Sequence, residues 1–276
     1  MAREDQIGPM RSLSILPALL IAATLSGPPA HAASSDWHVS EGGRIRIVTA
    51  NQPDAGGNLR GVLQIELKPG WKTYWRDPGD SGVPPQIMVD GPEVRQAELS
   101  FPAPTRHDDG YSEWAGYDSS VLLPIQFTLA GHHQPATIAA KVMIGMCERI
   151  CIPVHADLVV DPDRSSQQVV EEAMVHNALA ALPAPASPGF EASIATASDD
   201  TLTVEATLPE DARSAELFLA GEGGYAFATP VAKPADGKLV FEVPVVAKPA
   251  HKPDGQGLPY TLTSSAGAVS GFLPYP

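Results

Sequence analysis

The sequence predicts an all-β protein of two immunoglobulin-like β-sandwich domains, joined by a short helix and a proline-rich linker. Proline and glycine are frequent, with 28 and 24 residues among 276, whereas aromatic residues make up only 6%. Short apolar runs recur about every ten residues between turn-forming residues, and several alternate apolar with polar side chains, as half-buried strands do. This profile is typical of sandwiches rather than of helical folds.

The N-terminal segment, residues 1–32, has the three parts of a secretory signal peptide. Arg11 precedes an apolar run over 13–25, and an A-x-A cleavage site follows at 30–32; Met10 is an alternative start. The run is too short to span a membrane, so we expect cleavage and no direct membrane insertion. The predicted location is the periplasm, a compartment in which disulfides form and persist.

The first predicted sandwich spans residues 36–163. Its strand-like runs are RIRIVT, LRGVLQIEL, WKTYW, QIMVD, RQAELSF, VLLPIQFTL and ATIAAKVMIGM. Segments rich in glycine, proline and aspartate, such as DPGDSGVPP, separate the runs and predict turns and loops. So many strands in a segment of this length fit an immunoglobulin-like sandwich.

Residues 164–188 are predicted to form a helix and a stiff linker. Ser165 and Gln168 have the spacing of a capping box, and apolar residues recur after them at helical spacing. Pro183 ends the helix, and the PAPASP segment that it begins is a stiff connection. A second β-sandwich domain over 189–276 follows, and it carries no cysteine.

The charge of the chain argues against two classes of partner. Its formal net charge is −14 at pH 7. A surface of that sign repels phosphate backbones and anionic headgroups. We therefore expect no nucleic-acid partner and no binding to anionic lipid.

The residues that carry chemistry are the two cysteines, Cys147 and Cys151. On one continuous strand their Cα atoms would lie roughly 13 Å apart, too far for a disulfide, so a bonded pair requires a tight turn at 148–150. Loop-closure entropy gives about 2 kcal/mol for so short a ring, against more than about 4 for a ring of roughly 100 residues. A disulfide in so short a ring adds little stability, so a purely structural role is disfavoured and a redox-active disulfide is favoured.

A copper site is an alternative interpretation of the same segment. Met143, Met146 and His155 would add thioether and imidazole ligands to the cysteine pair, a set that suits Cu(I). On a strand, however, Met143 and Met146 have opposite parity and would face opposite sides. Zinc is disfavoured because no second ligand pair stands at the familiar spacing.

Three residues beside the cysteines can modulate their reactivity. Arg149 would favour a thiolate, whereas Glu148 would oppose it. Pro153 restricts the backbone directly after Cys151 and removes one hydrogen-bond donor.

Three motifs, in this order along the chain, resemble one family. They are PGWKTYWRDPGDSGVPP (69–85), RHDDGYSEWAGYDSSVLLPI (106–125) and the cysteine turn that ends in CIP. Together they resemble the periplasmic N-terminal domain of the thiol:disulfide interchange protein DsbD, and more closely its relative ScsB, a suppressor of copper sensitivity. The resemblance covers residues 37–161, and the helix and second β block match the ScsB-type extension more loosely.

The resemblance implies an immunoglobulin-like domain with one redox-active disulfide and no bound cofactor. Such a domain takes electrons from a membrane-embedded thiol reductase and passes them to periplasmic thioredoxin-fold proteins, in settings that include cytochrome c maturation and copper tolerance. By this resemblance Cys151 forms the mixed disulfide with partners and Cys147 resolves it. Because the chain stops at Pro276 without a membrane domain, we expect a separate membrane protein to complete the cycle.

The resemblance also implies a cap loop over the disulfide, at residues 107–114. Asp108, Asp109 and Tyr111 match the acidic and aromatic run of that loop. Gly110 stands where DsbD has its capping phenylalanine, so Tyr111 or Trp114 would have to shield the disulfide. The cysteines also have three residues between them rather than the five of DsbD, as in the ScsB branch.

A third interpretation remains open from the residues themselves: a non-catalytic binding module in which a structural disulfide pins a hairpin. On that interpretation Trp114 and Tyr117 only fill one end of the sandwich. Trp71, Tyr74 and Trp75 are expected to pack in the core or at its rim rather than to stack on a ligand.

Overall fold

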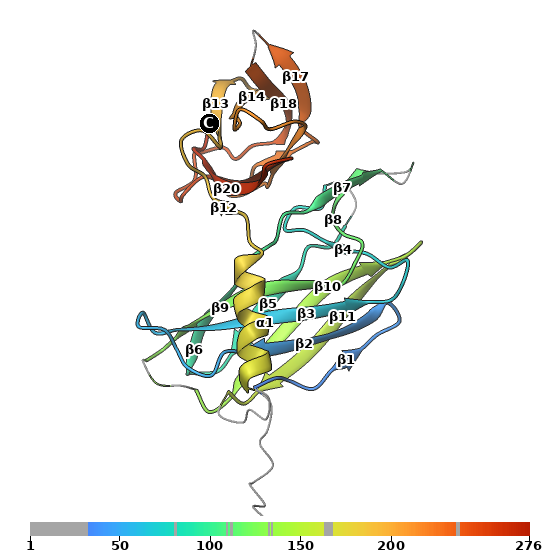
Figure 1. The fold of residues 1–276 in the computed structure, drawn as a ribbon, viewed down its shortest axis with the longest axis vertical. Helices are drawn as coiled ribbons and strands as arrows, with labels where there is room; N and C mark the ends of the chain where they lie inside the picture. Colours follow the sequence, from blue (N-terminus) through green and yellow to red (C-terminus); the bar gives the residue numbers. More distant parts are fainter. Residues whose placement is uncertain are drawn as a thin grey trace, which may run out of the picture.

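The computed structural model describes residues 33–79, 82–108, 110, 113–131, 133, 135–162, 168–235 and 238–276. Their strands form two separate groups of sheets with one helix between them in sequence, so the predicted all-β class is confirmed (Figure 1). The predicted signal peptide lies outside these residues, as does Ser165 of the predicted capping box. No helix in the described part is long and apolar enough to cross a membrane.

The first β unit is a sandwich of two antiparallel sheets with a small third sheet at one end. The five-stranded sheet has the order β1 (His38–Val39), β2 (Gly43–Thr49), β3 (Asn58–Leu67), β9 (Val121–Leu129), β6 (Val94–Leu99). The three-stranded sheet has the order β11 (Cys151–Val160), β10 (Ile138–Cys147), β5 (Gln86–Asp90). The small sheet has the order β4 (Thr73–Tyr74), β8 (Glu113–Tyr117), β7 (Thr105–Asp108).

The core of this sandwich follows from two-residue periodicity. In β11 every second residue from Val154 to Val160 is buried, and the residues between them are exposed. These side chains meet those of the opposite sheet, among them Ile45, Leu63 and Phe127, in one continuous cluster. Strands that alternate in this way bury one face of each sheet in the core between the two sheets.

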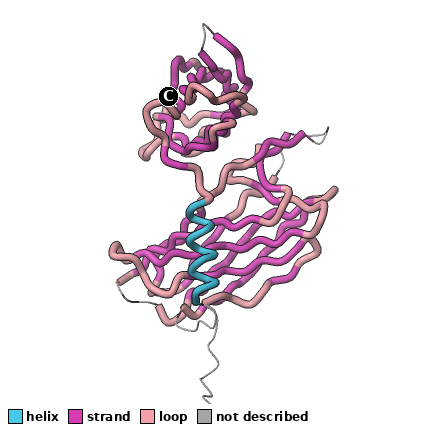
Figure 2. Tube along the Cα trace, in the orientation of Figure 1, coloured by secondary structure: helices cyan, strands magenta, loops and turns pink. Residues whose placement is uncertain are grey.

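Helix α1 (Gln168–Ala180) covers the outer face of the five-stranded sheet. Val175 and Ala178 pack on Val48 and Val62, and Figure 2 shows the helix lying across the strands. Glu171 is buried on the same face, where its carboxylate accepts a hydrogen bond from the backbone amide of Ala33. The helix therefore belongs to the packing of the first unit in addition to connecting it to the second.

The second β unit also has two main sheets. One has the order β12 (Ala184–Pro185), β20 (Gly267–Leu273), β19 (Leu258–Ser264), β15 (Ala215–Leu219). The other has the order β13 (Glu191–Ala197), β14 (Thr201–Thr207), β18 (Lys238–Ala247), β16 (Ala226–Phe227), with β17 (Val231–Ala235) also paired to β18. Its core is a second apolar cluster that includes Leu202, Leu217 and Phe241.

Strand β15 connects the two units by burying both of its faces. Leu217 and Leu219 point into the core of the second unit. Phe218, together with Ala220 just after the strand, belongs instead to the core cluster of the first unit. The ring of Phe218 contacts that of Trp75, with centroids 5.9 Å apart. The units thus share an apolar interface next to the small sheet β4–β8–β7.

At Gly116 in β8 the small sheet leaves no room for a side chain. A Cβ atom there would collide with the carbonyl oxygen of Thr73 and lie 2.9 Å from the Cα atom of Tyr74. We expect Gly116→Ala to lower the free energy of unfolding by about 1–3 kcal/mol, as overpacking does. Gly131→Ala is the matched control, because a Cβ atom at Gly131 meets nothing within 4 Å. Urea unfolding of both variants tests the prediction, and equal stabilities would contradict it.

Candidate redox site

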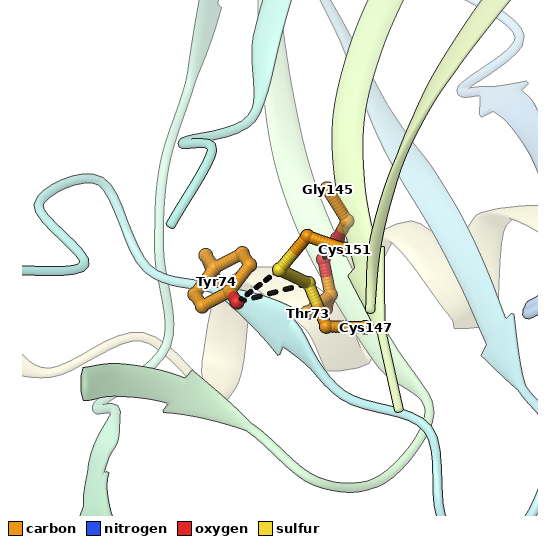
Figure 3. Close-up of a disulfide and its surroundings, with 5 residues drawn as sticks. All are labelled: Thr73, Tyr74, Gly145, Cys147 and Cys151. Atoms are coloured by element: carbon orange, nitrogen blue, oxygen red, sulfur yellow. Dashed lines mark hydrogen bonds between the residues drawn. A yellow bond between two sulfur atoms is a disulfide. The ribbon is translucent and has the colours of Figure 1, made fainter. Parts of the chain in front are cut away.

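The two cysteines close the hairpin formed by β10 and β11. Cys147 is the last residue of β10, Cys151 is the first of β11, and the register pairs them directly. Their Cα atoms are 4.1 Å apart and their sulfurs are bonded (Figure 3). Residues 148–150 form the bend between the strands. The tight turn expected from the spacing is therefore confirmed.

The two cysteines differ sharply in exposure. Cys147 is only 1% exposed, because its backbone is bonded on the other side to Lys72, with N–O distances of 2.8 and 2.9 Å. Cys151 is exposed, since β11 is the outermost strand of its sheet. An incoming thiolate can therefore approach the sulfur of Cys151 much more readily than that of Cys147.

Tyr74 places a hydroxyl group against the disulfide. Its oxygen lies 2.9 Å from Sγ of Cys147 and 2.9 Å from Sγ of Cys151 (Figure 3). Because disulfide sulfurs carry no proton, the tyrosine hydroxyl is the donor. Tyr74 is itself only 2% exposed, so this hydrogen bond is shielded from water.

Strand β4 holds Tyr74 in this position. The hydroxyl of Thr73 donates a 2.8 Å hydrogen bond to the carbonyl oxygen of Gly145 in β10. Gly145 leaves room for the tyrosine ring, because a Cβ atom there would lie 3.0 Å from Cδ2 of Tyr74 and 3.0 Å from Cβ of Val83. The absence of a side chain at Gly145 thus allows the ring to reach the sulfurs.

Trp114 packs beside the buried half of the disulfide. It is buried in one cluster with Tyr74 and Cys147, and its ring meets that of Tyr74 edge to face, with centroids 6.0 Å apart. On β7 the imidazole of His107 stacks on the indole with centroids 4.0 Å apart, and the ammonium group of Lys72 lies 4.3 Å from the indole centroid. We call Trp114 and His107 the cover of the site.

The segment expected to be a cap loop is mostly a β-hairpin. β7 and β8 extend to Asp108 and Glu113 and pair His107 with Trp114. Asp108 is exposed, and its carboxylate accepts a 2.7 Å hydrogen bond from the backbone amide of Gly110. This bond holds Gly110 in the turn after β7. Asp109 and Tyr111 lie outside the described residues.

The remaining candidate residues lie in different surroundings. Arg149 is exposed in the bend, and Pro153 pairs with Gly145. Met146 is fully buried, where its sulfur accepts a hydrogen bond from Ser40. Met143 pairs with His155 on the other face of the sheet, where both line a surface pocket of about 290 Å³.

The sulfur-bearing residues named for copper are therefore divided between the two faces of one sheet, as the parity argument predicts. The described residues hold no group of three or more His, Cys, Asp or Glu side chains that could bind a metal ion.

Three residues around the disulfide are absent from the sequence-based set of site residues: Tyr74, Lys72 and His107. Tyr74 and Lys72 lie in the WKTYW segment, which was expected only to pack. His107 was named only as the first residue of the expected cap loop and was given no role of its own. The contacts of Tyr74 and Lys72 arise because residues 72–74 lie against the end of β10, more than 70 residues along the chain, through the Lys72–Cys147 bridge and the Thr73–Gly145 hydrogen bond. No local pattern predicts such a contact.

An exposed cysteine bonded to a buried one, beside a buried tyrosine hydroxyl, is an arrangement suited to thiol–disulfide exchange. Residues 46–162 match the family described as thiol:disulfide interchange protein DsbD, N-terminal. This part of the chain is therefore a DsbD-like N-terminal domain, and the resemblance found in the sequence is confirmed. A comparison with curated proteins gave no match.

Two solved structures compare with the whole chain to very different degrees. The N-terminal periplasmic domain of ScsB from Proteus mirabilis has a TM-score of 0.70 at 20% identity, over 89% of this chain and 100% of that one. The N-terminal domain of DsbD from Neisseria meningitidis, in its reduced form, has a TM-score of 0.25 at 14% identity, over 49% of this chain and 90% of that one. The ScsB likeness shows that the fold is shared across both β units.

Proposed function

We propose that the chain is a periplasmic dithiol carrier that exchanges its Cys147–Cys151 disulfide with other thiol-redox proteins. The observation that carries the proposal is the asymmetry of the pair, in which one sulfur is exposed and the other is buried against a tyrosine hydroxyl. A purely structural disulfide in so short a ring would stabilise the fold by only about 2 kcal/mol. The domain family supports thiol–disulfide exchange in general.

In the proposed electron-accepting half of the cycle, a thiolate of a dithiol donor attacks Sγ of Cys151. A donor–Cys151 disulfide forms, the Cys147–Cys151 bond breaks, and Cys147 leaves as a thiolate that accepts the hydrogen bond of Tyr74. The donor's second thiolate then attacks the donor sulfur that is bonded to Cys151, which forms the donor disulfide and releases Cys151 as a thiolate. The donor becomes a disulfide, and the carrier gains two electrons and, after protonation, two protons.

In the proposed donating half, the same steps run in reverse with an oxidised acceptor. The Cys151 thiolate attacks the acceptor disulfide, and one acceptor sulfur leaves as a thiolate. Cys147 then attacks Sγ of Cys151, which restores the internal disulfide and frees the reduced acceptor. Following the resemblance, the proposed donor is a membrane-embedded thiol reductase and the proposed acceptors are periplasmic thioredoxin-fold proteins.

The surface around Cys151 suits a protein partner. Ile150, the residue before it, is 76% exposed and offers an apolar contact beside the reacting sulfur. Arg149 on the same bend is exposed and adds a positive charge to a chain of net charge −14. A partner that docks on this bend would bring its thiolate to Cys151 and leave Cys147 beneath the cover.

Trapping of mixed disulfides tests the proposal. In Cys147→Ala the Cys151 thiol has no resolving partner, so we expect disulfide-linked adducts with thioredoxin-fold or multispanning membrane proteins in periplasmic and membrane fractions. Cys151→Ala is the matched control, and the buried Cys147 thiol should give at least about tenfold fewer adducts, since thiol exchange depends on access. Adducts from neither variant, or equal amounts from both, would refute the carrier and favour a binding module with a structural disulfide.

A further inference from the structure

Strand β7 joins the cover of the redox site to the second β unit. The guanidinium group of Arg106 donates a 3.0 Å hydrogen bond to the carbonyl oxygen of Leu217 and lies 3.5 Å from the hydroxyl of Thr229. Its central carbon lies 4.7 Å from the ring centroid of Phe218. The next residue, His107, stacks on Trp114. One strand thus contacts the second unit with one side chain and the cover with the next.

A second connection runs through the segment after β4. The ring of Trp75 contacts Phe218, and the carboxylate of Asp77 accepts a 2.8 Å hydrogen bond from the amide of Gly221. Tyr74, whose hydroxyl bonds the two sulfurs, directly precedes Trp75. The backbone amide of Trp75 is bonded to Ala115, the residue after Trp114. Both segments that surround Cys147 therefore end at the interface with the second unit.

Apolar burial and a partly buried hydrogen bond hold the two units together at this interface. Phe218 and Ala220 are almost completely buried in the core of the first unit, so separation of the units would expose them to water. Arg106 is partly buried and keeps its charge beside Phe218 by bonding to a backbone carbonyl, an arrangement that is lost if the units part. The small sheet β4–β8–β7 lies at the end of the first sandwich that faces the second unit (Figure 1).

We propose that the second β unit acts as a clamp that keeps the cover closed over Cys147, with Arg106 as the positioning residue. The clamp deepens the proposed function, on which its biological meaning rests, by giving the second unit a role in setting which cysteine reacts. When Arg106 is lost, β7 is released from β15, the stack of His107 on Trp114 loosens, and Cys147 becomes accessible. Cys151, which is exposed at the start of β11, is unaffected.

Site-resolved alkylation of the fully reduced protein tests the clamp. Iodoacetamide is added in a time course, and the initial rates at Cys147 and Cys151 are measured separately by peptide mass spectrometry. In Arg106→Ala we expect the ratio of the Cys147 rate to the Cys151 rate to rise by about tenfold, the factor that corresponds to one hydrogen bond of a charged group. Arg106→Lys keeps the charge but loses the planar fork, and we expect an intermediate ratio.

Arg95→Ala is the matched control, because Arg95 is an exposed arginine of the same unit that also bonds a backbone carbonyl, that of Ala130. Its ratio should equal that of the wild type. Phe218→Leu alters the same interface from the side of the second unit while keeping an apolar side chain, and its ratio should also rise. This variant keeps the test decisive if Arg106→Ala fails to fold.

An unchanged ratio in both Arg106→Ala and Phe218→Leu would overturn the clamp, as would an equal rise in Arg95→Ala. The two interface changes should also be non-additive when combined, because they remove one shared contact. The readout needs no redox partner. If the protein fails the trapping experiment but passes the alkylation experiment, the carrier function is refuted and the clamp stands. If it passes the trapping experiment but fails the alkylation experiment, the clamp alone is refuted.

Discussion

Replacing Tyr74 by phenylalanine is expected to raise the pKa of the Cys147 thiol in the reduced protein, because it removes a hydrogen-bond donor from the sulfur. The hydroxyl lies 2.9 Å from the Cys147 sulfur in a buried setting and would stabilise a thiolate there. A hydrogen bond to a charged group is worth about 1.5–3 kcal/mol, and about 1.4 kcal/mol equals one pKa unit. The thiolate is the charged form, so removing its donor disfavours it and moves the pKa upward.

The same change should slow attack on Cys151 by external thiols. Cys147 is the leaving group in that step, and a leaving thiol of higher pKa departs more slowly. We expect the rate of disulfide reduction by dithiothreitol at pH 7 to fall by several-fold to about tenfold, since the leaving-group effect follows the pKa shift. The pKa is measured from thiolate absorbance against pH in the reduced protein, and the reduction rate is measured by stopped flow.

Tyr117→Phe is the matched control for this prediction. The hydroxyl of Tyr117 is also partly buried in the first unit, but it donates to the carbonyl oxygen of Pro102 and touches no sulfur. Neither the thiol pKa nor the reduction rate should change in this variant. A Tyr74→Phe protein with wild-type values for both would show that the hydroxyl plays no part in exchange.

Local sequence patterns predict the fold class and the cysteine turn because both depend on short-range geometry. Alternation of apolar and polar residues fixes which face of a strand is buried, as in β11. The spacing of Cys147 and Cys151 leaves only a tight turn if the two are bonded. Neither inference requires knowledge of which strands are neighbours.

The surroundings of the disulfide could not be predicted in the same way. Tyr74 reaches the sulfurs because residues 72–74 lie beside the end of β10, a contact between segments far apart in the chain. Trp114 was identified only through the family resemblance, and its stacking on His107 depends on the β7–β8 register. Tertiary pairing of this kind leaves no periodic signature in either segment.

A signal for the interface was present in the sequence and was not used. The run LFLA at 217–220 is apolar at every position, a pattern that fits a strand buried on both faces. The structure places Leu217 in one core and Phe218 in the other. The second unit, which carries no cysteine, is thus packed directly against the first.

Trp75→Ala is expected to cause the largest loss of stability among the changes considered for this protein. Trp75 is 2% exposed, belongs to the core of the first unit and contacts Phe218 of the second. Truncating a buried tryptophan to alanine costs about 3–5 kcal/mol. Its indole N–H makes no hydrogen bond within the described residues, so the loss is one of packing and not of a polar contact.

Guanidinium chloride unfolding measures this loss, and Trp37→Ala is the control. Trp37 is half-buried and lies beneath the guanidinium groups of Arg44 and Arg46, at 4.2 and 4.5 Å, so its removal should cost only about 1–2 kcal/mol, the value of two exposed cation–π contacts. Equal losses in the two variants would contradict a special role for Trp75.

The shape of the unfolding curve carries the second half of this prediction. If the shared apolar interface couples the two units, the wild type should unfold in one transition, whereas Trp75→Ala should unfold in two, because the first unit is weakened and its contact with Phe218 is lost. Trp75 also directly follows Tyr74, so the same variant should lose part of the shielding of Cys147. A single transition in Trp75→Ala, with Cys147 still protected from alkylation, would mean that the units fold together through contacts other than this one.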